Sequence, residues 1–238
     1  MRTTGSICGE MRDRSSSIWD ALHAHPFIRE LAAGTLPLEK FRFFIEQDNF
    51  YLVDYARCLA MGAAKSRNEV ELRYFTTDLN AVLDAELPSN RALLARVIEL
   101  RAADSGGSLT QAPANVAYTS YMQSLALRGG PLEIMAVLLP CAWSYIEIAH
   151  RLADETRDDH PVYSDWIAFF SLEQNVEMVE KMRADLDALI EEEGLTEARR
   201  DDLGQIFATS SRLERGFWDM VYRLEQWPDL AGAGPPSP

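Results

Sequence analysis

Apolar residues recur every third or fourth position along nearly the whole chain, and no segment alternates apolar and polar residues as a strand would. This period belongs to the amphipathic α-helix, in which 3.6 residues make one turn. The pattern therefore predicts an all-α fold. The predicted helices cover residues 15–23, 27–33, 38–66, 69–86, 89–103, 114–127, 132–155, a short segment ending at 170, 172–192 and 196–226.

Turn chemistry marks the breaks between the predicted helices. Breaks are expected at Pro88, at Gly106-Gly107 and at Gly129-Gly130-Pro131. Pro37 opens the 38–66 helix, where the missing N–H of proline costs nothing. Residues 229–238 are small and proline-rich, so they bury too little surface to order themselves. We therefore expect a single helical domain over residues 1–228 and a disordered tail over 229–238.

The composition narrows the class of partner. A net charge of -14 argues against nucleic acid or an anionic membrane, because phosphates would be repelled. A small neutral or cationic ligand is easier to accept. The amino terminus has no apolar signal segment and no uninterrupted apolar run approaches ~18 residues, so a cytoplasmic protein is expected. Three cysteines form neither a disulfide framework nor a CxxC site and are expected to be reduced.

One face of the predicted 38–66 helix carries polar groups where a core stripe would be aliphatic. Asp48, Tyr51, Tyr55 and Cys58 lie at i, i+3, i+7 and i+10 and so share that face. One interpretation is an amphipathic boundary with Asp48 in solvent. The other is a carboxylate beside flat aromatic rings, which suits a nitrogen heterocycle. Spacing alone leaves both open.

A cysteine follows a proline inside the most apolar predicted helix. Pro140 removes one backbone hydrogen bond, to the Ala136 carbonyl, and so predicts a kink. Cys141 and Tyr145 are i,i+4 neighbours, which places the phenol beside the thiol. Free cysteine is among the most buried residue types, so Cys141 either fills space in the core or is a functional thiol.

A glutamate lies on an otherwise apolar face of the last predicted helix. This stripe contains Phe207, Ser210, Glu214, Phe217, Trp218 and Val221. An unpaired buried carboxylate is costly, so Glu214 is either in a structural ion pair, for example with Arg57 or Arg212, or has a raised pKa suited to acid–base chemistry.

Signals for other chemistries are weak. The four histidines show no HxxxH or ExxH pairing on one helix, which gives little support to metal or haem ligation. The chain also has no glycine-rich phosphate loop and no GxSxG elbow.

Several ordered motifs between residues 20 and 228 resemble the TenA / thiaminase II family. They are His25-Pro26-Phe27, Gly34-Thr35-Leu36-Pro37, Gln47-Asp48-x-x-Tyr51-Leu52, Ala117-Tyr118-Thr119, Leu138-Leu139-Pro140-Cys141-x-Trp143-x-Tyr145, Tyr163-x-x-Trp166-Ile167 and Glu214-x-x-Phe217-Trp218-x-Met220-x-Tyr222. The resemblance implies a haem-oxygenase-like helical bundle. It also implies a cytosolic homotetramer that needs no metal or organic cofactor.

The activity implied by this resemblance is hydrolysis of 4-amino-5-aminomethyl-2-methylpyrimidine to the hydroxymethyl pyrimidine and ammonia, a step of thiamin salvage. Thiamin is a second candidate substrate. Cys141 matches the family's nucleophile, and Asp48 and Glu214 match its acids. We expect Asp48 to hold the pyrimidine amino group and Glu214 to donate and accept protons, although sequence does not decide that division. Pocket residues are matched by Tyr51, Tyr118, Tyr145 and Phe217.

Two positions depart from the family pattern. Phe170 occupies a position where the family commonly has a tyrosine near the nucleophile, and Asn90, close to Glu86, stands where a histidine is often found. Loss of one hydrogen bond at Phe170 would cost about 1 to 3 kcal/mol if it matters in the transition state, or roughly tenfold to a hundredfold in rate. We expect these departures to affect catalytic efficiency and substrate preference more than the fold.

Two other functions compete with the hydrolase. A pyrimidine-binding or regulatory protein would keep the pocket and turn over poorly, as Phe170 permits. A metal-dependent oxidase of the same helical superfamily would need clustered histidine and carboxylate ligands, and the scattered histidines argue against it.

Overall fold

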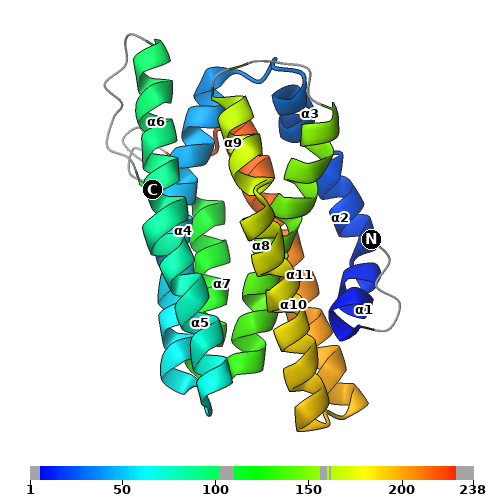
Figure 1. Ribbon diagram of the computed structural model, residues 1–238. Coiled ribbons are helices and arrows are strands. Elements are labelled where there is room, and N and C mark those ends of the chain that lie inside the picture. The colour runs from blue at the N-terminus through cyan, green and yellow to red at the C-terminus, as the bar shows by residue number, and fades with distance from the viewer. Residues whose placement is uncertain (1–5, 102–109, 156–159, 161, 229–238) are drawn as a thin grey trace, which may run out of the picture.

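A computed structural model describes residues 6–101, 110–155, 160 and 162–228, and these residues form an all-helical bundle without a strand (Figure 1). The predicted fold class is confirmed. The helices are α1 Ile7–Arg14, α2 Ser16–His23, α3 Pro26–Ala32, α4 Leu38–Lys65, α5 Glu69–Ala81, α6 Leu87–Arg101, α7 Pro113–Arg128, α8 Pro131–Glu155, α9 Tyr163–Phe170, α10 Glu173–Glu193 and α11 Glu197–Arg223, with a π-helical segment, η1 Val82–Glu86, between α5 and α6.

The long helices form two groups that meet along the centre of the bundle. In one group α4 packs against α5, α6 and α7, and in the other α8 packs against α10 and α11 (Figure 1). Contacts of α4 and α7 with α8 and α11 join the two groups. Residues 134–139 of α8 are completely buried, which explains their continuous apolar sequence.

An aromatic cluster ties the two groups together near the centre of the bundle. The rings of Phe44 on α4 and Trp218 on α11 stack with centroids 5.1 Å apart. The centroid of the Phe27 ring on α3 lies 5.4 Å from that of Phe44 and 5.1 Å from that of Trp218. Such large buried rings contribute much of the packing energy, so this cluster fixes α4 and α11 relative to each other.

Part of α8 has the length and composition of a membrane span. The segment Pro131–Ala153 is sufficiently apolar, but 83% of its most apolar window is buried inside the bundle. That burial is what the core helix of a helical domain shows.

Two predictions about the helices are wrong. The sequence pattern misses α1, whose first turn is capped by Ser6 accepting a hydrogen bond from the Gly9 amide at 2.8 Å. Pro88 does not break the chain, because α6 begins at Leu87 and continues through it. The Leu87 amide donates to the Val82 carbonyl five residues back, as in a π-helix, so a proline without an N–H is accommodated directly afterwards.

Other predicted breaks have different outcomes. The break at Gly129-Gly130-Pro131 is confirmed, because α7 ends at Arg128 and α8 begins at Pro131. The break at Gly106-Gly107 and the tail over 229–238 lie outside the described residues. Helix α8 is continuous through Pro140.

Candidate functional site

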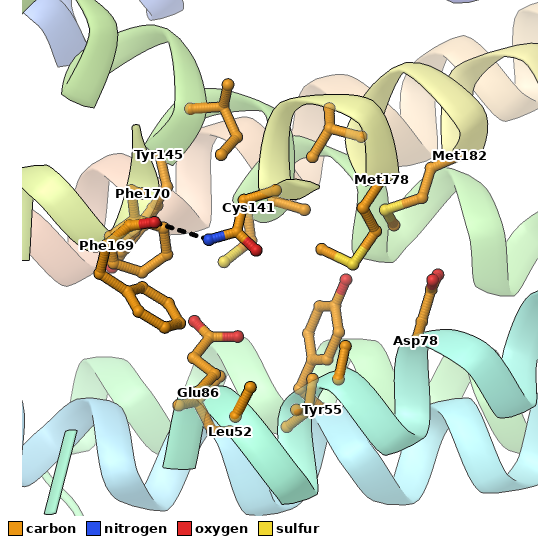
Figure 2. Close-up of a pocket in the computed structure, with 17 residues that line it drawn as sticks. Leu52, Tyr55, Asp78, Glu86, Cys141, Tyr145, Phe169, Phe170, Met178 and Met182 are labelled. Carbon is orange, nitrogen blue, oxygen red and sulfur yellow. Dashed lines mark hydrogen bonds between the residues drawn. The ribbon is translucent and has the colours of Figure 1, made fainter. Parts of the chain in front are cut away.

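A cavity opens between α4, the α5–η1 segment, α8, α9 and α10 (Figure 2). Its lining is largely apolar and aromatic, with acidic groups at Asp78 and Glu86 and the thiol of Cys141. Figure 2 shows the Cys141 sulfur directed into the cavity from α8, opposite Glu86.

Cys141 is a buried, free thiol with 9% of its surface exposed. Burial and the nearby Glu214 carboxyl raise the pKa of Cys141 well above its ordinary value, while the Tyr51 hydroxyl acts in the opposite direction. The thiol is therefore protonated at neutral pH. Because the thiolate is the nucleophilic form, chemistry at this sulfur needs a base close by.

Four buried polar residues near Cys141 are not among those that line the cavity and are called the polar cluster below: Asp48, Tyr51, Tyr118 and Glu214. The rings of Tyr51 and Tyr118 have centroids 5.0 Å apart. Two buried oxygens of this cluster, the Tyr51 hydroxyl and Glu214 Oε1, have no hydrogen-bond partner. A buried polar atom without a partner is costly.

Asp48 is buried rather than solvated, so the amphipathic-boundary interpretation of its helix face is wrong at this residue. Asn90 donates a hydrogen bond of 2.6 Å to Asp48 Oδ2. This bond favours the carboxylate, but burial is the larger effect and raises the pKa of Asp48 to about 7. Asn90, which stands where the family often has histidine, is thus a direct partner of the site acid.

Glu214 makes no ion pair among the described residues, so the predicted structural pair with Arg57 or Arg212 is wrong. Arg57 instead forms an ion pair with Asp54, with Nη1 2.5 Å from Oδ1. Burial raises the pKa of Glu214 to about 8, with Asp48 adding to the shift and the Tyr118 hydroxyl opposing it. A carboxyl group with a pKa near neutral can both accept and release a proton.

Tyr118 is held in place through two helices. Its hydroxyl lies 3.2 Å from the Ser210 hydroxyl on α11, which in turn donates to the Val137 carbonyl of α8 at 2.6 Å. This chain of hydrogen bonds fixes one wall of the polar cluster.

The predicted site residues divide between the cavity and the polar cluster. Cys141, Tyr145 and Phe170 line the cavity, whereas Phe217 lies on the polar-cluster side, with its ring 6.0 Å from Tyr51. The Tyr145 ring contacts Phe170 at 5.1 Å. Cys141 is thus the junction of the two sets.

Sequence reasoning did not assign two acidic side chains that line the cavity. Glu86 projects into it from η1 (Figure 2), and burial together with Asp48 raises the pKa of Glu86 to about 8. Asp78 lines the opposite end, and burial raises the pKa of Asp78 to about 7. The π-helical segment that sets the direction of Glu86 has no clear sequence signal. Asp78 has no motif around it.

No group of three or more histidine, cysteine, aspartate or glutamate side chains suited to a metal ion occurs in the described parts of the chain.

The fold and site define an all-helical protein with a cysteine and buried acids around a small-molecule cavity. Residues 12–224 match the model of the TENA/THI-4/PQQC family, and the chain belongs to that family. The chain is 36% identical over 223 residues to the aminopyrimidine aminohydrolase of Halalkalibacterium halodurans, covering 93% of this chain and 98% of the relative.

Solved structures agree with the family assignment. The TenA homologue of P. horikoshii OT3 superposes with a TM-score of 0.78 at 30% identity, covering 92% of this chain and 99% of that one. A domain of unknown function from Shewanella denitrificans with a heme oxygenase-like fold gives a TM-score of 0.67 at 14% identity, covering 91% and 92%. The predicted resemblance to TenA and the predicted fold are both confirmed.

Proposed function

We propose that the protein hydrolyses 4-amino-5-aminomethyl-2-methylpyrimidine to the hydroxymethyl pyrimidine and ammonia, with thiamin as a second substrate. The observation that carries the proposal is the position of Cys141, which faces a cavity and is backed by an acid with an unpartnered oxygen. Relatives named aminopyrimidine aminohydrolase at 31 to 36% identity give the same reaction class.

Catalysis begins with proton exchange at Glu214, whose pKa of about 8 leaves it largely protonated at neutral pH: it gives its proton to a ring nitrogen and takes the proton of the Cys141 thiol. The thiolate then forms a bond to the electron-poor ring carbon next to the substituted one. Expulsion of the amine with its electron pair leaves an exocyclic carbon–carbon double bond. Water adds to the exocyclic carbon, the carbon–sulfur bond breaks, and the aromatic ring is restored.

The departing nitrogen needs a proton before it can leave as ammonia. Glu86 lines the cavity opposite Cys141, and its pKa of about 8 leaves it largely protonated at neutral pH. We assign this proton transfer to Glu86. In this scheme Glu214 acts on the thiol and the ring, and Glu86 acts on the leaving group.

The remaining predicted residues bind the pyrimidine. Asp48, held by Asn90, accepts from the amino group of the ring, and the unpartnered Tyr51 hydroxyl reaches a polar edge. Aromatic surfaces for stacking come from Tyr118, Tyr145, Phe170 and Phe217.

The resemblance to TenA is also the ground for proposing a cytosolic homotetramer. Large apolar side chains are exposed along the neighbouring segments α5, η1 and α6, which would supply a subunit contact: Val70, Leu72, Leu83, Ile98 and Leu100.

A side-by-side turnover assay tests the proposed function. Ammonia release from the aminomethyl pyrimidine and thiazole release from thiamin are followed with native protein and with Cys141→Ala as the control. We expect the native protein to release ammonia and Cys141→Ala to release none above background. Absence of turnover of both compounds by the native protein would refute the hydrolase.

A pyrimidine-binding or regulatory protein is the second candidate, favoured by Phe170. Its phenyl ring faces the cavity where a phenol is common in the family, so one polar contact near the thiol is missing. Micromolar binding of the pyrimidine with no turnover would establish this candidate.

A further inference from the structure

The wall that α9 and α10 give to the cavity carries one polar side chain among its described residues. This side chain is Asn175, in the first turn of α10. The other residues that line the cavity from these two helices are apolar: Phe169, Phe170, Met178, Val179 and Met182. An amide on such a wall is costly unless it forms hydrogen bonds, so its bonds have to be accounted for.

One half of the Asn175 amide has a partner in the protein. Its Nδ2 donates to the Phe169 carbonyl at 2.6 Å, and this bond is the dashed line in Figure 2. The carbonyl belongs to the last turn of α9, where carbonyls lack partners within their own helix, and it also accepts from the Leu172 amide at 3.3 Å. Asn175 therefore joins the end of α9 to the start of α10.

The bond to Phe169 fixes the orientation of the amide. If the two amide atoms were exchanged, Oδ1 would face the Phe169 carbonyl and two acceptors would oppose each other. Asn175 is partly exposed and lines the cavity, and no described residue donates a hydrogen bond to its Oδ1. The group that Asn175 offers to the cavity is therefore an acceptor.

The neighbouring polar groups are proton donors. Phe169 lies at the same end of the cavity as Cys141 and Glu86 (Figure 2). The Cys141 thiol is protonated at neutral pH, and the pKa of Glu86, raised to about 8 by burial and Asp48, leaves that carboxyl largely protonated. The amide oxygen of Asn175 does not titrate and accepts at every pH. A ligand nitrogen with N–H groups and a lone pair can donate to Asn175 and accept from Glu86 together.

Resting on the function proposed above, we propose that Asn175 binds the nitrogen of the leaving group. Its Oδ1 accepts an N–H of the exocyclic aminomethyl group, which turns the lone pair of that nitrogen toward Glu86. The phenyl ring of Phe170 offers the nitrogen no hydrogen bond, so Asn175 supplies the polar contact on this wall. Asn175 thus distinguishes pyrimidines that carry a hydrogen-bond donor on the exocyclic carbon from those that carry none.

Calorimetric titration of the Cys141→Ala protein measures this contact without turnover. The ligands are the aminomethyl pyrimidine and 4-amino-2,5-dimethylpyrimidine, whose exocyclic carbon has no donor. Adding Asn175→Leu should lower the preference for the aminomethyl ligand on the order of tenfold, as loss of one buried hydrogen bond does. A purely structural role would weaken both ligands alike. An unchanged ratio, or no preference in the Cys141→Ala protein itself, would overturn the proposal.

Asn175→Asp separates the acceptor from the bond to Phe169. Ionised aspartate keeps an oxygen acceptor in the same place but cannot donate to the Phe169 carbonyl. The preference for the aminomethyl ligand should therefore be retained, and this nearly isosteric variant also covers the case in which Asn175→Leu fails to fold. Loss of the preference in Asn175→Asp would assign the effect to the junction of α9 and α10 and overturn the contact with the ligand.

Gln174→Leu is the matched control, because it removes an exposed amide from the neighbouring position of α10. It should leave the ratio of the two affinities within twofold. A tenfold loss of preference in Gln174→Leu as well would show that the effect does not come from the cavity, and would overturn the proposal.

The outcomes separate the role of Asn175 from the proposed function. Turnover of the aminomethyl pyrimidine by the native protein, with an unchanged binding ratio in Asn175→Leu, would leave the hydrolase standing and overturn the role of Asn175. A tenfold loss of preference in a protein that turns over neither the aminomethyl pyrimidine nor thiamin would refute the hydrolase and keep the contact.

Discussion

Replacing Glu214 by glutamine should remove part of the stability that the native protein loses as the pH rises. In the unfolded chain a glutamate has a pKa of about 4.3, whereas burial raises the pKa of Glu214 in the folded protein to about 8. The folded state therefore binds the proton more tightly. The stabilising contribution of Glu214 is fully present below its pKa in the unfolded chain and is lost as the pH rises through its pKa in the folded protein.

The size of this effect follows from the two pKa values. Each pH unit between them costs up to about 1.4 kcal/mol, so the native protein should lose on the order of 3 kcal/mol from this residue between pH 5 and pH 8. Glutamine does not titrate. The stability difference between Glu214→Gln and the native protein should therefore grow by that amount over this range.

Urea unfolding at pH 5, 6, 7 and 8 measures this difference directly. A constant cost of placing an amide at the site cancels, because only the change with pH is compared. Glu177→Gln, which alters an exposed glutamate on α10, is the matched control and should show a pH-independent difference. A pH-independent difference for Glu214→Gln as well would refute the raised pKa on which the proposed proton exchange at Glu214 rests.

Two further predictions concern the cavity wall and the helix packing. Phe170→Tyr places a hydroxyl in the cavity and should raise kcat/KM for the aminomethyl pyrimidine roughly tenfold, measured by initial rates of ammonia release; an unchanged rate would show that no hydrogen bond is missing there. Gly62→Ala places a β-carbon against the buried Phe75 ring and should lower the free energy of unfolding by about 1 to 3 kcal/mol in urea. Gly216→Ala, in a helix with open space around it, should raise that free energy by about 0.5 to 1 kcal/mol, and equal effects at the two glycines would contradict the close packing of α4 on α5.

The helices could be predicted because their signal is local. The periodic apolar pattern locates α4, α8, α10 and α11 to within a few residues. The missed helix α1 is short and largely polar, and its buried side chains pack on α10 and α11, distant in sequence. The rule that proline breaks a helix fails at Pro88, because the preceding turn is π-helical. The sequence carries no sign of the hydrogen bonds of that turn.

The candidate site was predictable where residues carry a motif. The buried positions of Cys141 and Glu214 agree with sequence expectation, whereas spacing left Asp48 between a solvated boundary and a site, and the structure buries it; the roles of all three stay proposals. Glu86 and Asp78 were not assigned, because a carboxyl on a partly exposed helix looks like a surface group until the opposite wall is known. Here that wall comes from α8, α9 and α10, more than fifty residues further along the chain.

The rate of ammonia release by Cys141→Ser tests the central claim most directly. Serine keeps the size and most of the hydrogen bonding of the thiol but is a far weaker nucleophile, so the covalent route predicts a fall of roughly a thousandfold or more. Circular dichroism of the same sample checks that the helical fold is retained. Turnover by Cys141→Ser close to that of the native protein would contradict nucleophilic catalysis by Cys141.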